Sequence, residues 1–255
     1  MVEPPIKEVI NQMTTDLRER RAKKPDPERI ALIKGDLRTS ILDIRASRLL
    51  YKDGLYSLST YHLQQAAEKA TKAYFLFTGF ITKQDRRNMS HDLARGQRWL
   101  FENASAYVGL IKDIGPEFSF DDSVIKSLEK SENKRIELAT TSEHNIRALM
   151  DEYDSAKVKY RNLVEQMFIE FFGSGEFQSA TPDVGAFIDA ANEISFLFIA
   201  SLLTFPHEAF SRYADNEKLN YNDYTMDMGI VKTTTDLLMR IEKAVIALDK
   251  IIEWP

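Results

Sequence analysis

The sequence predicts an all-α protein built from long helices. Only ten glycines and eight prolines occur in 255 residues, and long blocks of sequence contain neither. Inside these blocks apolar residues recur three or four positions apart, which is the period of an amphipathic helix. No stretch of useful length alternates between apolar and polar residues as a strand does, and the chain contains no internal repeat.

The first two helices are expected at 5–24 and 27–52. Along 5–24 the apolar residues gather on one side, and a basic segment that contains proline ends the helix. Asp26 is expected to cap the second helix, with Pro27 at its first position. An aspartate at this position accepts hydrogen bonds from the free N–H groups of the first turn, and proline needs no such partner there.

Two glycines delimit the next predicted helix, which covers 55–78. Gly54 offers a tight turn before it, and Gly79 ends it, as glycine commonly does at helix C-termini. A further helix is expected to begin at His91, after a polar loop. These boundaries follow from local chemistry alone.

The second half of the chain is expected to be helical as well. The block 121–172 has neither glycine nor proline and predicts one very long helix, or two helices with a bend near 140–142. Helices are also expected over 184–204, which Pro206 stops, and over 226–252. We expect the chain to divide into an N-terminal extension, a helical bundle, a linker, and C-terminal helices that pack on the bundle: 1–30, 31–172, 173–182 and 183–255.

Charge and cysteine content exclude several classes of protein. The formal net charge of −5 at pH 7 argues against a general polyanion binder. Residues 1–52 nevertheless carry 12 Lys and Arg against 8 Asp and Glu, so they form either a patch that meets phosphate or a solvated helix face. The absence of cysteine excludes disulfides, thiolate metal sites and a cysteine nucleophile. It also suits a reducing compartment and, with no leader pattern at the N-terminus, predicts a cytoplasmic protein.

The most apolar run, 186–205, is long enough to raise the question of a membrane span. Asp189, Asn192 and Glu193 interrupt it, and carboxylates are costly at the centre of a bilayer. We therefore expect a buried core helix and no membrane contact. Asp189 and Glu193 lie four residues apart. One interpretation is a buried acidic pair with shifted pKa values. The favoured interpretation is that they lie at the exposed edge of the helix or pair with a lysine.

Several catalytic motifs are missing from the chain. It has no Gly-rich phosphate loop, GxGxxG, GxSxG or HExxH pattern, and none of the four histidines has Glu three positions before it. We therefore expect no nucleotide-dependent α/β fold, no α/β-hydrolase, no bound metal and no cofactor.

The predicted helix 55–78 carries two distinct stripes. Its alanines allow a neighbouring helix to approach closely. Beside them His62, Gln65, Lys69 and Lys72 lie three or four residues apart and share one face. Glu68 can pair with Lys72 at i,i+4. Each of these polar residues is explained either by ligand binding or by helix solvation and packing.

An ordered pattern runs through this region: G-x-Y-x-x-x-x-Y-H-x-Q-Q-A-A-E-K-A-x-K-A, then a glycine, then S-H-D-L. It resembles the HEPN family, small helical bundles found in prokaryotic toxin–antitoxin and defence systems. The resemblance is tight over about 40 residues and extends to 31–172 if the flanking helices belong. The matching residues are Gly54, Tyr61, His62, Gln64, Gln65, Ala66, Ala67, Glu68, Lys69, Ala70, Lys72, Ala73, Gly79, Ser90, His91, Asp92 and Leu93.

The resemblance implies an up-and-down helical bundle, which extra helices extend at both the N- and the C-terminal end of this chain. It also implies a homodimer, a nucleotidyltransferase encoded beside the chain as a partner, and a metal-independent endoribonuclease as one candidate activity. In many members Arg-x(4–6)-His marks that activity, and Arg86 and His91 have this spacing. A histidine can move the proton of a ribose 2′-OH, and an arginine can stabilise the phosphoryl oxygens. Arg87 departs from the asparagine or other polar, non-basic residue often found after the arginine, and His91 also fits a helix-start residue without a catalytic role.

Other members resemble nucleotide-binding modules that hold phosphate between helices. In this chain the residues that could do so are His62, Gln65, Lys69, Lys72 and Arg95. The leading hypothesis is a helical module that binds nucleotide or RNA and acts with a partner protein. The alternatives are an endoribonuclease toxin that uses Arg86 and His91, and an oligomeric scaffold without a ligand.

Overall fold

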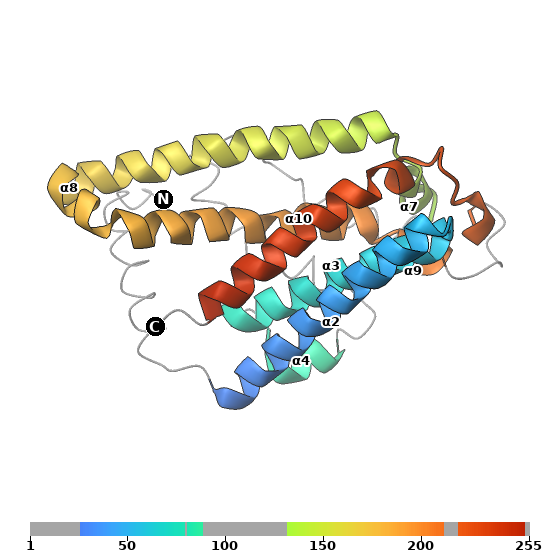
Figure 1. The fold of residues 1–255 in the computed structure, drawn as a ribbon, viewed down its shortest axis with the longest axis horizontal. Helices are drawn as coiled ribbons and strands as arrows, with labels where there is room; N and C mark the ends of the chain where they lie inside the picture. Colours follow the sequence, from blue (N-terminus) through green and yellow to red (C-terminus); the bar gives the residue numbers. More distant parts are fainter. Residues whose placement is uncertain (1–25, 80, 89–131, 212–218, 253–255) are drawn as a thin grey trace, which may run out of the picture.

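The computed structural model describes residues 26–79, 81–88, 132–211 and 219–252. All regular secondary structure in these ranges is helical, which confirms the predicted all-α class (Figure 1). The helix predicted at 5–24 and the helix predicted to begin at His91 lie outside the described residues.

The first two helices that the structure describes form as their sequences predict. Helix α2 covers Pro27–Lys52, and the Asp26 side chain accepts a hydrogen bond from the backbone N–H of Glu28. Helix α3 covers Tyr56–Thr78. Both flanking glycines adopt the left-handed conformation, with φ of 75° at Gly54 and 77° at Gly79. Gly54 therefore makes the turn before α3, and Gly79 ends α3, as their sequence positions indicated.

The block after residue 121 contains a bend at the expected place. Helix α4, which covers Lys83–Asn88, precedes this block. Within the block α7 covers Glu132–Ala139, and α8 begins at Glu143. The Ser142 side chain caps α8 by accepting a hydrogen bond from the N–H of Asn145. Of the two arrangements that the sequence allowed, two helices with a bend is therefore the one observed.

Helix α8 spans Glu143–Thr204 and reverses direction within its length, so that it forms a helical hairpin (Figure 1, yellow to orange). Ion pairs Lys157–Glu193 and Arg161–Asp189 join its two arms, and both pairs are centred on residue 175. Glu193 and Asp189 thus pair with basic residues, as favoured from the sequence.

The segment 173–182 differs from its expected form as a linker. Its backbone is helical and lies at the reversal of the α8 hairpin. Its two glycines disfavour a helix locally, but helix propensity is a weak influence that contacts between neighbouring elements override. The division of the chain into domains stays a prediction.

The chain leaves α8 before Pro206 and returns through short helices. Helix α9 covers His207–Phe210, the 3₁₀ helix η2 covers Tyr221–Asp223, and α10 covers Gly229–Ile252. The last helix begins three residues later than predicted. None of the described helices combines the length and apolarity needed to cross a bilayer.

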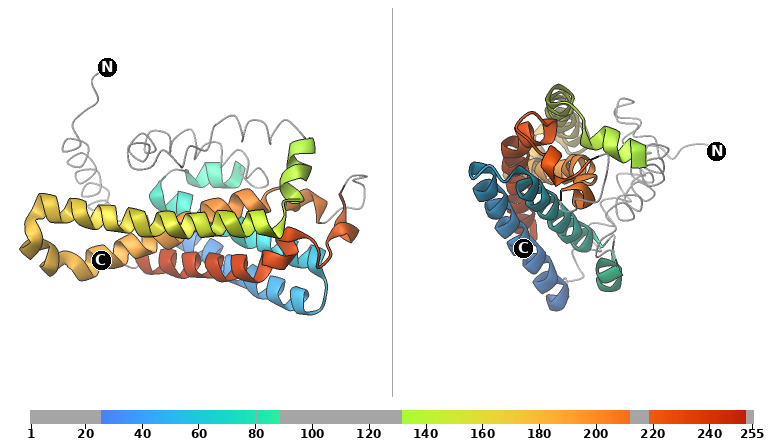
Figure 2. Two further views of the ribbon diagram at one scale, coloured as in Figure 1. Left: turned by 90° about the horizontal axis from the view of Figure 1, so that it is seen from above. Right: turned by 90° about the vertical axis from the view of Figure 1, so that its right-hand side faces the viewer.

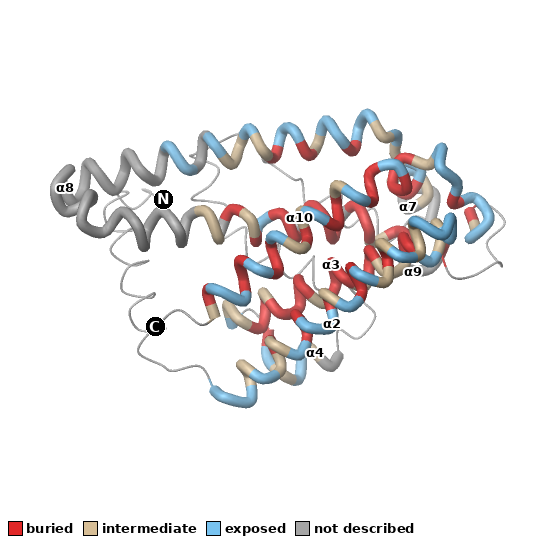
Figure 3. The backbone as a smooth tube through the Cα atoms, viewed as in Figure 1, coloured by how far each residue is buried: buried red, intermediate tan, exposed pale blue. Residues whose placement is uncertain are grey.

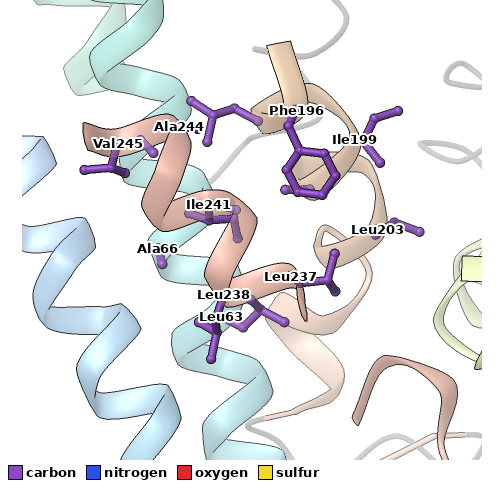
Figure 4. Close-up of a cluster of buried hydrophobic side chains, with 14 of the residues drawn as sticks. Leu63, Ala66, Phe196, Ile199, Leu203, Leu237, Leu238, Ile241, Ala244 and Val245 are labelled. Atoms are coloured by element: carbon purple, nitrogen blue, oxygen red, sulfur yellow. The ribbon is translucent and has the colours of Figure 1, made fainter. Parts of the chain in front are cut away.

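The core lies among α2, α3, the returning arm of α8, and α10. Helix α10 contacts all of the other three, and α3 is enclosed along most of its length (Figures 2 and 3). Figure 4 shows where the buried side chains of three helices meet. The labelled residues are Leu63 and Ala66 of α3, Phe196, Ile199 and Leu203 of α8, and Leu237, Leu238, Ile241, Ala244 and Val245 of α10.

Candidate functional site

A row of buried polar side chains lies between α2 and α3. Asp36, Ser40, Asp43 and Ser47 follow one another at intervals of four, three and four residues, so they share the side of α2 that faces α3. Ser40 Oγ donates to the carbonyl of Ala66 at 2.8 Å, and Ser47 Oγ donates to that of Ser59 at 2.8 Å. The small serine and alanine side chains let the two helices approach closely, and the aspartates add negative charge to their interface.

Asp43 gathers two of the predicted ligand-binding residues. Its Oδ1 lies 2.8 Å from Nδ1 of His62, and its Oδ2 accepts a hydrogen bond from Nζ of Lys69. Burial alone raises the pKa of Asp43, but the hydrogen bonds from His62 and Lys69 and the positive charge of Lys69 outweigh burial and hold the pKa below its usual value of 3.8. Asp43 is therefore ionised at neutral pH.

His62 and Lys69 retain access to solvent. The exposed fractions of their side chains are 30% and 26%, whereas that of Asp43 is 11%. A lysine ammonium has three N–H donors, and Lys69 uses one of them on Asp43. An Asp–His hydrogen bond also fixes the ring orientation, which leaves the opposite nitrogen of His62 directed away from Asp43. The cluster can therefore donate hydrogen bonds to an anion, from Lys69 and from His62 when its ring is protonated, or move a proton through His62.

The other half of the polar stripe is organised by Glu68. Lys72 Nζ donates to Glu68 Oε1, which confirms the predicted i,i+4 pair, and Gln65 Nε2 donates to Glu68 Oε2 at 3.2 Å. Only 9% of the Lys72 side chain and 6% of the Glu68 side chain are exposed. The charge of Lys72 is thus compensated by Glu68 inside the fold, and the predicted roles of Lys72 and Gln65 in ligand binding stay predictions.

Arg86 of α4 is held at a separate point of the same helix pair. Its Nε donates to Asp36 Oδ2 at 2.6 Å, and its Nη2 donates to Asp36 Oδ1. This two-point ion pair ties α4 to α2 and raises the pKa of Arg86 through the hydrogen bonds from its guanidinium. His91 and Arg95 lie outside the described residues, so the expected pairing of Arg86 with His91 stays a prediction.

Two of the carboxylates that organise the site, Asp36 and Asp43, were not singled out from the sequence. Asp36 and Asp43 lie seven residues apart on the side of α2 that also carries Ile33, Leu37 and Ile44. A carboxylate within an apolar stripe is rarely buried without a partner. An aspartate within the apolar face of α2 was therefore the feature of the sequence that could have identified these residues. It predicts a basic partner on the neighbouring helix.

In the part of the chain that the structure describes, no three His, Asp or Glu side chains gather in a way that could hold a metal ion. Residues 36–94 match the family model of the HEPN domain, which confirms the resemblance seen in the sequence. The match contains Asp36, Asp43, His62, Lys69 and Arg86 and supports a function related to nucleotides or RNA. No curated protein and no solved structure matches the chain.

Proposed function

We propose that this chain, which carries a HEPN domain over residues 36–94, binds a nucleotide or RNA through the His62–Asp43–Lys69 cluster and acts with a partner protein. The observation that carries the proposal is the convergence of His62 and Lys69, both partly exposed, on one ionised carboxylate. The carboxylate orients both donors, so a phosphate group meets N–H groups whose positions are already fixed.

The small net charge of the cluster suits a single phosphate group. Asp43 offsets one positive charge, so the cluster has a net charge of +1 when His62 is protonated and none when it is neutral. Hydrogen bonds from charged donors to phosphate are about twice as strong as neutral ones. We expect Lys72 to stabilise helix α3 rather than to contact the phosphate, because its ammonium is already bound to Glu68.

Direct binding measurements test this site. Fluorescence anisotropy with a labelled short single-stranded RNA, and calorimetry with ATP, are expected to detect binding to the full chain. His62→Ala and Lys69→Ala should each weaken binding by about tenfold, since each removes one charge-assisted hydrogen bond. Lys52→Ala is the matched control, because Lys52 is an exposed lysine at the end of α2.

Thermal unfolding of each variant shows whether a loss of binding reflects a loss of fold. If Lys52→Ala weakened binding as much as the two site variants do, the loss of binding would reflect net charge alone. That result would overturn the assignment of the site. Absence of binding by the wild-type chain to both probes would overturn the function. The expected partner is a nucleotidyltransferase, and co-purification of the two full chains after co-expression tests that part of the proposal.

The Arg86-x4-His91 spacing supports the endoribonuclease alternative, for which the ion pair with Asp36 suggests a sharp test. RNA cleavage in the presence of EDTA should disappear in both Arg86→Ala and His91→Ala if the two residues are catalytic. Asp36→Asn is the matched control. It weakens the ion pair that positions Arg86, but the Arg86 side chain itself is still present. Cleavage that persists in Arg86→Ala, or that is lost only when the variants unfold, would contradict the catalytic roles.

A further inference from the structure

One side of α3 stays accessible to solvent along the N-terminal part of the helix. Leu55, the residue before α3, is followed at intervals of three, four, three and four residues by Leu58, His62, Gln65 and Lys69, which places all five on this side. Leu55 and Leu58 are 49% and 45% exposed, and the other three are partly exposed. This α3 stripe is therefore apolar at its N-terminal end and polar and cationic at its C-terminal end.

The cationic end of the α3 stripe is closed beyond Lys69. The next residue on this side of the helix is Lys72, which is buried and whose ammonium is bound to Glu68. A ligand whose phosphate is held by His62 and Lys69 therefore extends along this side of α3 only towards Leu58.

Leu58 lies at the distance from His62 that a nucleotide requires. It precedes His62 by four residues, or one helical turn of about 5.4 Å. A single exposed leucine is ordinary on a protein surface, but this one lies one turn from the group expected to meet a phosphate. In a nucleotide one pentose joins the phosphate to the base, so a base reaches about as far. The face of a base is flat and weakly hydrated, and covering an exposed leucine with it removes apolar surface from water.

Tyr61 borders the same point of the α3 stripe. It follows Leu58 by three residues, and its ring meets the ring of His62 edge to face, with the centroids 5.3 Å apart. His62 is thus held by Tyr61 as well as by Asp43, which bonds to its Nδ1. The polar and apolar ends of the stripe meet at a side chain whose orientation is fixed.

We propose that the ligand of this site is a nucleotide unit that lies along α3, with its phosphate at His62 and Lys69 and its base over Leu58. The inference rests on the proposed function and adds to it the orientation of the ligand and the residue that selects for a base. Leu58 offers apolar surface but no hydrogen-bonding group. It therefore favours a nucleotide over a bare sugar phosphate and does not distinguish strongly among the bases.

Calorimetry of the full chain with AMP and with ribose 5-phosphate tests the position of the base, because the two probes differ only in the base. The wild-type chain is expected to bind AMP about tenfold more tightly than ribose 5-phosphate. Leu58→Gln should weaken the binding of AMP about fivefold and leave that of ribose 5-phosphate unchanged. Leu58→Trp should strengthen the binding of AMP, since an aromatic ring stacks on a base.

Val158→Gln is the matched control, because Val158 is a 59% exposed aliphatic residue on the first arm of α8. It should bind AMP as the wild-type chain does. A single-stranded RNA hexamer distinguishes a residue of RNA from a free nucleotide. Whichever of AMP and the hexamer binds more tightly identifies the source, and Leu58→Gln should weaken the binding of that probe.

The outcomes separate this inference from the proposed function. The position of the base is wrong if AMP and ribose 5-phosphate bind equally, or if Leu58→Gln leaves the binding of the tighter probe unchanged, while His62→Ala and Lys69→Ala still weaken binding. The phosphate site then stands without it. If the wild-type chain binds none of the three probes, the phosphate site is itself wrong, and the inference is overturned with it.

Discussion

Gly229→Ala is expected to lower the free energy of unfolding by about 3 kcal/mol, the upper part of the range for overpacking a closed interior site. A Cβ at this position would lie 2.2 Å from the carbonyl oxygen of Thr141 and 2.7 Å from the backbone nitrogen of Glu143. Both contacts are with backbone at the bend between α7 and α8, so rotating a side chain cannot relieve them. Either the start of α10 or the bend must move.

Denaturant unfolding of the wild-type chain and Gly229→Ala measures this loss. Thr235→Ala is the control, since Thr235 is an exposed residue two turns further along α10, where alanine is a better helix former. Unfolding of Gly229→Ala at the same denaturant concentration as the wild-type chain would contradict the close backbone contact.

The contact at Gly229 also shows where prediction from the sequence ends. The ends of α2 and α3 were predictable because each depends on residues within a few positions: the Asp26 side chain caps α2, and Gly79 takes the left-handed conformation after α3. The bend before Ser142 was one of two arrangements that the sequence allowed. Its packing against residue 229 was not predictable, because local chemistry contains no information about which distant segment will arrive there.

The candidate site divides in the same way. Helical spacing placed His62 and Lys69 on one face of α3 from the sequence, since that face depends only on the period of the helix. The partner that orients them, Asp43, belongs to another helix, and the helical spacing along α3 contains no information about it. The i,i+4 pair of Glu68 and Lys72 was predictable because both residues belong to one helix.

The reversal inside α8 shows how distant contacts change a local expectation. Two glycines and a proline within 173–182 suggested a non-helical linker, yet the backbone there is helical. The ion pairs of Lys157 with Glu193 and of Arg161 with Asp189 connect the arms on either side of it. Such pairs specify the register of the hairpin more than its stability, since exposed ion pairs contribute little free energy.

The unfolding free energy is expected to decrease as the pH falls from about 6.5 towards 4.5, and the buried His207 should account for part of this decrease. His207 is 1% exposed and starts α9, and its Nδ1 lies 2.7 Å from the hydroxyl of Tyr224. Burial lowers the pKa of His207 from 6.5 to about 3, because the charged ring would lose its hydration. Nothing in the sequence around Pro206 indicated this burial.

The sign follows from the protons bound in each state. Between pH 6.5 and about 3 the unfolded chain protonates this histidine while the folded chain leaves it neutral, so acid favours unfolding. The contribution of His207 is complete above pH 6.5 and diminishes by about 1.4 kcal/mol for each pH unit below it. Carboxylates with lowered pKa, such as Asp43 and Asp154, lose their contribution only below their unfolded value of 3.8. The interval from pH 6.5 to 4.5 therefore reports on histidines.

His207→Gln isolates the effect, because the glutamine amide can still hydrogen-bond to Tyr224 but does not titrate. Urea unfolding at several pH values should show a smaller pH dependence for His207→Gln than for the wild-type chain, by one proton over this interval. Tyr224→Phe should keep the wild-type slope, since burial rather than the tyrosine hydroxyl lowers the pKa of His207. Parallel pH profiles for the wild-type chain and His207→Gln would show that His207 is protonated in the folded protein, and they would contradict its place in the core.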